Sequence, residues 1–124
     1  MAGLTFDTGA LVGLERRRHR MRAVFATAIG QGLRVTVPAA VVVEWWRGRT
    51  DFAEDILASV DVEPLDEALA RIAGEAMAAV RGASAVDAVV MASAARRGDI
   101  VYTTDLGDLS RLQRHFRSVR VLAA

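Results

Sequence analysis

The sequence predicts an α/β fold, with a mainly parallel sheet flanked by helices. Short apolar segments of strand length alternate along the chain with longer helical segments, and this alternation is typical of parallel sheets. The 124 residues include only two prolines and no internal repeat or flexible linker, so we expect one domain over residues 1–124. In sheets of this kind the functional crevice lies beyond the carboxyl ends of the strands.

Five segments are predicted to be strands. "GLTF" is short and apolar and ends at Asp7, "LRVTV" alternates with β-branched residues, and "DIVYTT" is an apolar run that meets Asp105. "VDVEPL" and "VRVLAA" are the other two strand segments. The predicted strands are 3–6, 33–37, 60–65, 99–104 and 119–124.

Helices are predicted between these strands from their start and stop signals. Residues 8–20 lead into a first helix, which a pair of glycines ends, and Pro38 starts the next helix in its favoured first-turn position. Asp66 caps a later helix, and Gly98 ends the one that follows it. The predicted helices are 21–32, 38–48, 51–59, 67–80, 84–98 and 109–116.

The composition excludes several classes of protein. There is no cysteine, so disulfides, thiolate metal sites and cysteine nucleophiles are excluded, and a reducing cytoplasm is compatible. The net charge of +1 gives no whole-molecule argument for nucleic acid, although all 16 basic residues are arginine, which suits phosphate recognition. The N-terminal segment is a poor signal peptide, and the longest apolar run, "VPAAVVV", is far shorter than the ~20 residues of a membrane span. We therefore expect a cytoplasmic location and no membrane partner.

Two acidic residues directly follow predicted strands. Asp7 comes after "GLTF" and Asp105 after "DIVYTT", so both carboxylates should project into the crevice at the carboxyl ends of the strands. Taken alone, each also has a purely structural explanation. Asp7 can cap a helix that begins at Thr8, and Asp105 can form a turn with Gly107.

Two further acidic residues interrupt apolar helical segments. Glu44 lies within "VVVEWWRG", where an unpaired carboxylate facing a core would cost several kcal/mol, and Asp87 lies within "SAVDAVVM". These residues have structural explanations too. Glu44 can pair with Arg47 one helical turn later, and Asp87 follows Ser84 at the spacing of a capping box.

Convergence of these four carboxylates on one crevice would create strong repulsion, and some of them would have to stay protonated. A divalent cation removes this repulsion, and the hard cations Mg²⁺ and Mn²⁺ take oxygen ligands. Zn²⁺ fits poorly because the chain has two histidines and no cysteine. The acids therefore predict a crevice that is compatible with Mg²⁺ or Mn²⁺.

Three motifs occur in a characteristic order: "LTFDTGALV", then "VVVEWWRG", then "SAVDAVVMASAARRGDIVYTTDLGDL". In the last block Asp-Ala opens a helix rich in small residues, and a strand then runs into Thr-x-Asp. This order resembles the PIN domain, particularly the compact VapC-type toxins of bacterial toxin–antitoxin pairs. The likeness covers essentially the whole chain.

The resemblance implies a three-layer α/β/α sandwich and a Mg²⁺- or Mn²⁺-dependent endoribonuclease. It also implies a set of site residues, which are carried over by position. These are Asp7, Glu44, Asp87 and Asp105 as catalytic metal ligands, Asp108 as a further ligand, and Thr8 and Thr103 as residues that line the site.

The same resemblance implies the substrate and the partners. Toxins of this type cleave structured RNA, such as transfer RNA or ribosomal RNA, and thereby inhibit translation. They are commonly homodimers, and a small VapB-like antitoxin blocks the site. The alternative is a catalytically silent PIN-like scaffold that binds RNA or a partner without cutting it.

Positive charge must flank an acidic crevice that receives RNA. "ERRRHRMR" (15–22) places five arginines close in sequence to Asp7, and phosphate binding is favoured over a merely solvated helix face. Arg47 is a weaker candidate, because it can instead pair with Glu44. The predicted RNA-binding residues are Arg16, Arg17, Arg18, Arg20, Arg22 and Arg47.

The remaining aromatic and imidazole side chains have simpler explanations. Trp45 and Trp46 could stack on bases, but a place in the core or in a dimer interface is favoured for at least one of them. His19 and His115 do not follow strands as the acids do, so we expect both at the surface or partly packed.

Two other acidic-pocket proteins are disfavoured. A haloacid dehalogenase-like phosphatase needs a second aspartate two residues after its nucleophile, where this chain has Gly9, and it needs a later lysine. A receiver-type signalling module also needs a lysine after its last strand. This chain contains no lysine.

Overall fold

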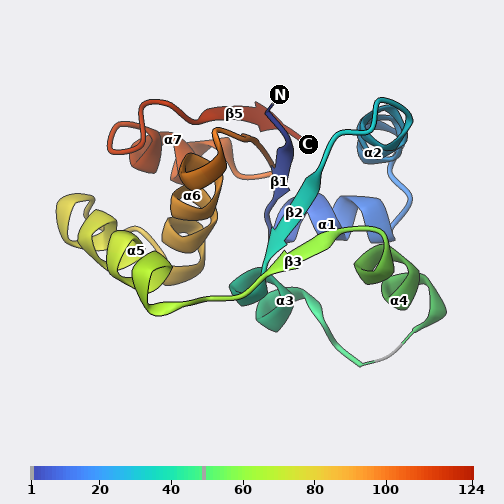
Figure 1. Cartoon of the computed structure of the whole chain (residues 1–124), viewed down its shortest axis with the longest axis horizontal. Helices are drawn as coiled ribbons and strands as arrows, with labels where there is room; N and C mark the ends of the chain where they lie inside the picture. Colours follow the sequence, from blue (N-terminus) through green and yellow to red (C-terminus); the bar gives the residue numbers. More distant parts are fainter. Residues whose placement is uncertain (1, 49) are drawn as a thin grey trace.

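The computed structural model describes residues 2–48 and 50–124, which form a five-stranded sheet between two layers of helices (Figure 1). The strand order is β3-β2-β1-β4-β5, and every neighbouring pair is parallel. The predicted α/β fold with a parallel sheet is therefore confirmed. The strands are β1 (Leu4–Phe6), β2 (Val35–Pro38), β3 (Asp61–Glu63), β4 (Ile100–Thr103) and β5 (Arg120–Ala123).

The helices lie on both faces of this sheet. Helices α1, α2 and α4 cover one face, α5, α6 and α7 lie on the other, and α3 follows the carboxyl end of β2 (Figure 1). None of the helices in the described residues has both the length and the apolar character needed to span a membrane. The helices are α1 (Thr8–Glu15), α2 (His19–Gly30), α3 (Ala39–Trp45), α4 (Asp51–Ala58), α5 (Glu67–Ala79), α6 (Ala85–Arg97) and α7 (Leu106–Gln113).

The core lies around the central strands. β1 and β2 are buried along their whole length because helices cover both faces, whereas the edge strand β3 is largely exposed. Phe6 of β1 packs edge-on against Tyr102 of β4, with ring centroids 6.2 Å apart, and also contacts Phe25 of α2. On the other face, α6 is buried from Ala88 to Ala94, and its small residues allow close packing against the sheet.

Several predicted helix boundaries are confirmed by their caps. The Asp66 carboxylate accepts the Leu69 N–H at 2.8 Å and starts α5, and the Ser84 hydroxyl accepts the Asp87 N–H at 3.1 Å and starts α6. Helix α6 ends at Gly98, whose φ of 72° lies in the left-handed region that glycine adopts without strain.

Helix boundaries were predicted wrongly in three parts of the chain. Residues 8–30 form two helices rather than a lead-in and one helix, because the chain turns at Arg17, whose φ is 57°. The turn is stabilised by Arg17 N–H and Arg18 N–H, which donate to carbonyls of α1, and by the Arg17 guanidinium, which lies 4.9 Å from the centre of the Phe52 ring.

The other two parts are α3 and α7, and α7 both begins and ends three residues earlier than predicted. Pro38 is the last residue of β2 and only precedes α3, which ends at Trp45 rather than near Gly48. Helix α7 begins at Leu106, three residues before the predicted start, because the Asp105 carboxylate caps it.

A partly buried ionic network, which the sequence did not reveal, joins α6 to β1 and β3. The Arg97 guanidinium pairs with Glu63 and with Asp99, to which Nε donates at 2.9 Å, and it also donates to the Thr5 and Ser93 hydroxyls. Asp99 in turn accepts the Gly3 N–H at 3.0 Å and the Thr5 hydroxyl at 2.9 Å. Its members lie up to 96 residues apart in the chain, so the network links distant segments.

Candidate active site

The predicted acidic residues meet at the carboxyl edge of the sheet. Asp7 directly follows β1, Asp105 follows β4 after one residue, and Glu44 lies on α3, which begins where β2 ends. Helix α6 leads back to the start of β4, so its first turn, which holds Asp87, lies at the same edge. Asp108 lies in the first turn of α7. We call these five residues the acidic cluster.

Asp7 is the most buried member of the cluster, with 6% of its surface exposed. Its Oδ1 accepts the Ala10 N–H at 2.9 Å, which caps α1, and its carboxylate is also hydrogen-bonded by the Thr103 hydroxyl. Burial raises the pKa of Asp7 above its ordinary value, and the nearby Asp87 and Asp105 carboxylates raise it further. The two hydrogen bonds act in the opposite direction but do not cancel the effect.

Asp87 is partly buried and is influenced by the rest of the cluster. Burial is the main cause that raises its pKa, and the carboxylates of Asp108, Asp105 and Glu44 add to this, against a hydrogen bond with Ser84. Together with the effect of Asp87 and Asp105 on Asp7, these interactions connect all five carboxylates electrostatically. The fold thus concentrates negative charge at one edge of the sheet.

Two hydroxyl groups link members of the cluster. Thr103 is fully buried, and its hydroxyl interacts with Asp7 while accepting the Asp105 N–H at 2.8 Å. The Thr8 hydroxyl donates to Glu44 Oε1 at 2.6 Å and so ties α1 to α3. A Cβ at Gly9 would overlap the Thr104 hydroxyl, so the absence of a side chain lets α1 approach the segment that carries Asp105.

Most of the acidic residues also have the structural contacts that the sequence suggested for them. Asp7 and Asp105 do cap helices, and the capping contact of Ser84 to Asp87 is present, so capping and membership of the cluster coexist. Within the described residues, Glu44 forms no ion pair with Arg47. The Arg47 guanidinium donates instead to the Trp46 carbonyl at 3.1 Å.

The donor chemistry of the cluster fits a hard divalent cation. It offers carboxylate oxygens, with hydroxyl oxygens beside them. A bound cation would neutralise the negative charge of these carboxylates and so relieve the repulsion between them. As the side chains stand, no group of three or more acidic or histidine side chains in residues 2–48 and 50–124 could hold an ion. Mg²⁺ usually binds one or two carboxylates and keeps several waters, so binding needs fewer direct ligands than the cluster has.

The raised pKa values predict how the metal-free protein responds to pH. Between the ordinary carboxyl pKa of 3.8 and the raised values of Asp7 and Asp87, the folded chain binds more protons than the unfolded chain. The resulting stabilisation is present below that ordinary pKa and is lost as the pH rises through the raised pKa values.

We therefore expect the double variant Asp7→Asn/Asp87→Asn to gain stability relative to the wild type as the pH rises from about 4 to about 7 in the presence of chelator. Urea unfolding at several pH values would measure the difference in the free energy of unfolding. A difference that stays constant over this range would contradict the raised pKa values.

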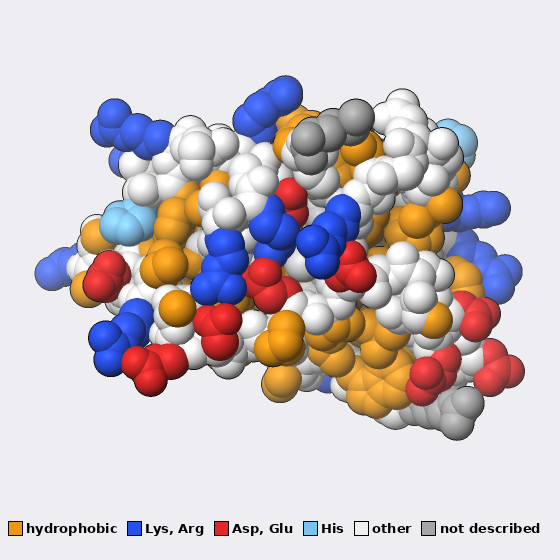
Figure 2. Space-filling model, in the orientation of Figure 1, with side chains coloured by type: hydrophobic (Ala, Val, Ile, Leu, Met, Phe, Trp, Pro, Cys, Tyr) orange, Lys and Arg blue, Asp and Glu red, His pale blue; other side chains and the backbone are white. Residues whose placement is uncertain are grey.

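The arginines predicted to bind RNA do not form one uniform surface. Arg20 donates to the Ala123 carbonyl at the end of β5 at 2.8 Å, and Arg17 lies over Phe52. Arg16, Arg18 and Arg22 are exposed. On the face shown in Figure 2, basic and acidic side chains are interspersed. Any basic binding site on the described part of this face is therefore small.

The tryptophans and histidines lie where the favoured interpretation put them. Trp45 is 5% exposed and belongs to the core, so base stacking is wrong for this residue, and Trp46 is half-buried beside it. His19 and His115 are both exposed. Sequence reasoning missed a set of arginines around the end of α7, of which Arg111 forms an ion pair with Asp108 at 3.2 Å.

The chain is similar to known proteins along nearly its whole length. The family model of the PIN domain matches residues 4–114. A search of curated proteins finds no significant match.

Solved structures with similar folds come from several bacteria. A chain of the DNA-bound VapBC complex of Salmonella typhimurium matches with a TM-score of 0.74 and 17% identity, covering 99% of this chain and 98% of that chain. A chain of DNA-bound VapBC2 from Rickettsia felis matches with a TM-score of 0.76 and 8% identity, covering 98% of each chain. A chain of FitAcB from Neisseria gonorrhoeae matches with a TM-score of 0.69 and 20% identity, covering 96% of each. At these identities the likeness shows a shared fold.

Proposed function

This chain belongs to the PIN-domain family, whose members are generally nucleases, and on that premise we propose that it is a Mg²⁺- or Mn²⁺-dependent endoribonuclease. The observation that carries the proposal is the acidic cluster, in which carboxylates from separate elements lie at one edge of the sheet. Burial, and in addition the repulsion between these carboxylates, raises the pKa values of Asp7 and Asp87. A fold gains no stability from such repulsion. Function is the reason that we propose for its presence.

The residues of the cluster would hold the cation, with Asp7, Glu44, Asp87 and Asp105 as ligands and Asp108 as an auxiliary one. When bound, the cation supplies Lewis-acid activation of a water and neutralises charge that develops on the phosphate. Asp7 is oriented by its bonds to the Ala10 N–H and to Thr103, and Glu44 by its bond to Thr8. In-line attack of water on phosphorus with cleavage of the P–O3′ bond would leave a 5′-phosphate and a 3′-hydroxyl.

We further propose that the chain is the toxin of a type II toxin–antitoxin pair that cleaves structured RNA, such as transfer or ribosomal RNA. The similar structures of VapBC and FitAcB support a small VapB-like antitoxin as a partner, and we propose a homodimer as the assembly. Arg16, Arg18 and Arg22, which are exposed, remain proposed RNA contacts, as do Arg17, Arg20 and Arg47.

The test is cleavage of bulk transfer and ribosomal RNA by the purified chain with Mg²⁺, with Mn²⁺ and with excess chelator. We expect cleavage with either metal, no cleavage with chelator, and 5′-phosphate ends on the products. Cleavage that persists in excess chelator would contradict the role of the cluster. RNA binding without cleavage under all three conditions would instead support the silent scaffold.

A further inference from the structure

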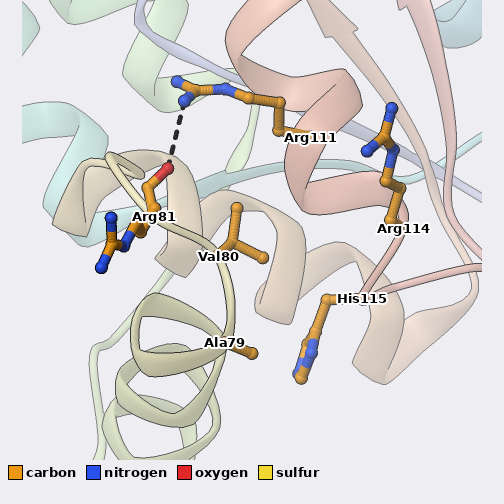
Figure 3. A pocket seen from close by; sticks show the side chains of 6 residues that line it. All are labelled: Ala79, Val80, Arg81, Arg111, Arg114 and His115. Atoms are coloured by element: carbon orange, nitrogen blue, oxygen red, sulfur yellow. Dashed lines mark hydrogen bonds between the residues drawn. The ribbon is translucent and has the colours of Figure 1, made fainter.

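A basic pocket lies between the end of α5 and the end of α7. Its volume is about 490 Å³, and its lining residues are Ala79, Val80, Arg81, Arg111, Arg114 and His115. Figure 3 shows the side chain of Arg111 reaching from α7 to the segment after α5, with Val80 and Ala79 below it. Pockets for small ligands have volumes of about 300–1,000 Å³, so this one can take a nucleotide.

Arg111 connects this pocket to the acidic cluster. One end of its guanidinium donates to the Arg81 carbonyl at 3.1 Å, and the other donates to Asp108 Oδ1 at 3.2 Å. Gly82 has a φ of 76°, and a Cβ there would lie 3.1 Å from Arg111 Nη1, so glycine allows the chain to turn close to the guanidinium. A ligand bound at the acidic cluster that extends past Asp108 would therefore reach the basic pocket.

Two of the three arginines that line the pocket carry charge that no carboxylate of the described residues neutralises. Among the described residues, no carboxylate pairs with Arg81 or Arg114, and no acidic residue lines the pocket. Arg114 also lines a neighbouring hollow of about 580 Å³, together with Arg117, Ser110 and Gln113. Guanidinium groups bind phosphate in fixed geometry through paired N–H donors, and the apolar wall of Ala79 and Val80 suits a ribose or a base.

We propose that this pocket binds a backbone phosphate of the RNA strand next to the nucleotide held at the acidic cluster, with Arg81 and Arg114 as phosphate-binding residues. The proposal rests on the proposed function, because it takes RNA as the substrate. It differs from the sequence-based prediction, which placed RNA contacts on arginines of residues 16–22, at the opposite layer of helices, and on Arg47. An acidic protein segment is disfavoured, because Arg111 of the pocket also contacts Asp108 of the proposed phosphodiester site, and because Ala79 and Val80 give the pocket an apolar wall.

The test is the affinity of the full chain for a short fluorescein-labelled single-stranded RNA of mixed sequence, measured by fluorescence anisotropy in excess chelator so that no RNA is cut. The variant is Arg81→Gln/Arg114→Gln. The matched control is Arg34→Gln/Arg120→Gln, which removes two exposed arginines at the amino ends of β2 and β5.

We expect the pocket variant to weaken binding about tenfold near physiological salt, and to lower the slope of log K against log salt by about 0.7 for each phosphate that the protein no longer neutralises. The control should change both quantities much less. If the double variant folds poorly by circular dichroism, Arg114→Gln alone at the end of α7 should show about half of the effect on the logarithm of the affinity.

Equal losses of affinity in the pocket variant and the control, or no loss in either, would overturn the proposal. So would competition by a polyglutamate peptide that matches unlabelled RNA of equal charge, since this would indicate an acidic protein ligand. Cleavage is measured separately with Mn²⁺. If the wild type never cuts RNA but the pocket variant binds RNA more weakly, the proposed nuclease activity is refuted and the RNA-binding pocket is supported. If the wild type cuts RNA but the pocket variant binds it as tightly as the wild type does, the nuclease activity is supported and the pocket is refuted.

Discussion

Replacing Asp7 with asparagine is expected to lower the rate of RNA cleavage by at least about a hundredfold, with little change in RNA affinity measured in chelator. Loss of a group that merely orients a metal ligand typically costs about 10- to 100-fold in activity or metal affinity, so loss of a central ligand should cost more. Asp7 is central here because it is buried, directly follows β1, and interacts with both Asp87 and Asp105. The measurement is a single-turnover cleavage assay with saturating Mn²⁺.

The Asp7→Asn substitution also separates a catalytic loss from a folding defect. Asparagine caps helices about as well as aspartate, so its side-chain oxygen can keep accepting the Ala10 N–H at the start of α1. Because burial raises the pKa of Asp7, removal of its charge should leave the melting temperature in chelator at neutral pH unchanged or higher.

The matched control for this experiment is Asp55→Asn on α4. It removes the same charge from an exposed position outside the acidic cluster. Full cleavage by the Asp7→Asn variant, or an equal loss in the Asp55→Asn variant, would contradict the assignment of Asp7 as a ligand.

Much of the fold follows from local sequence signals. The alternation of strand and helix segments predicted the parallel sheet, and Asp66, Ser84 and Gly98 marked helix ends that the structure confirms. The errors arose where tertiary contacts decide the backbone. The turn at Arg17 depends on packing against Phe52, which lies 35 positions later in the sequence and which no local pattern indicates.

The candidate site was predictable to a similar extent. Asp7 and Asp105 are recognisable because they follow apolar strands, and parallel strands bring their carboxyl ends to one edge. The partner of Glu44 was not predictable from local spacing, which offered only Arg47 one turn away, whereas the fold supplies Thr8 from another helix. The basic pocket was missed for the same reason, because the segment after α5 and the end of α7 contribute its arginines from positions about 30 residues apart.

The two kinds of charged site in this chain have opposite consequences for stability. In the acidic cluster, burial raises the pKa values of Asp7 and Asp87 and nearby like charges raise them further, so ionisation of these carboxylates lowers the stability of the fold. In the network around Arg97, opposite charges are paired and hydrogen-bonded in a partly buried place, with Asp99 itself buried, so each member depends on the others. Removing a single charge from the acidic cluster should therefore not lower stability, whereas removing the charge of Arg97 from its network should.

Substitution of Arg97 by methionine is therefore expected to lower the free energy of unfolding by about 3–5 kcal/mol, the usual cost of leaving a buried ion unpaired. Asp99, which is 3% exposed, and Glu63 would both lose their cationic partner, and the Thr5 and Ser93 hydroxyls would lose the N–H groups that donate to them. Since domains of this kind have total stabilities of about 5–15 kcal/mol, such a loss would be large. Urea unfolding at neutral pH would measure it.

Arg96→Met is the matched control, because Arg96 is the adjacent residue and carries the same charge. Its ion pair with Asp66 lies at the surface at 3.3 Å, where the Asp66 side chain is 55% exposed, so its loss should cost less than about 1 kcal/mol. Replacing the whole network, by adding Glu63→Gln and Asp99→Asn to Arg97→Met, should recover part of the stability because no buried charge is then left unpaired. Equal destabilisation by Arg96→Met and Arg97→Met would show that the network contributes no more than a surface ion pair.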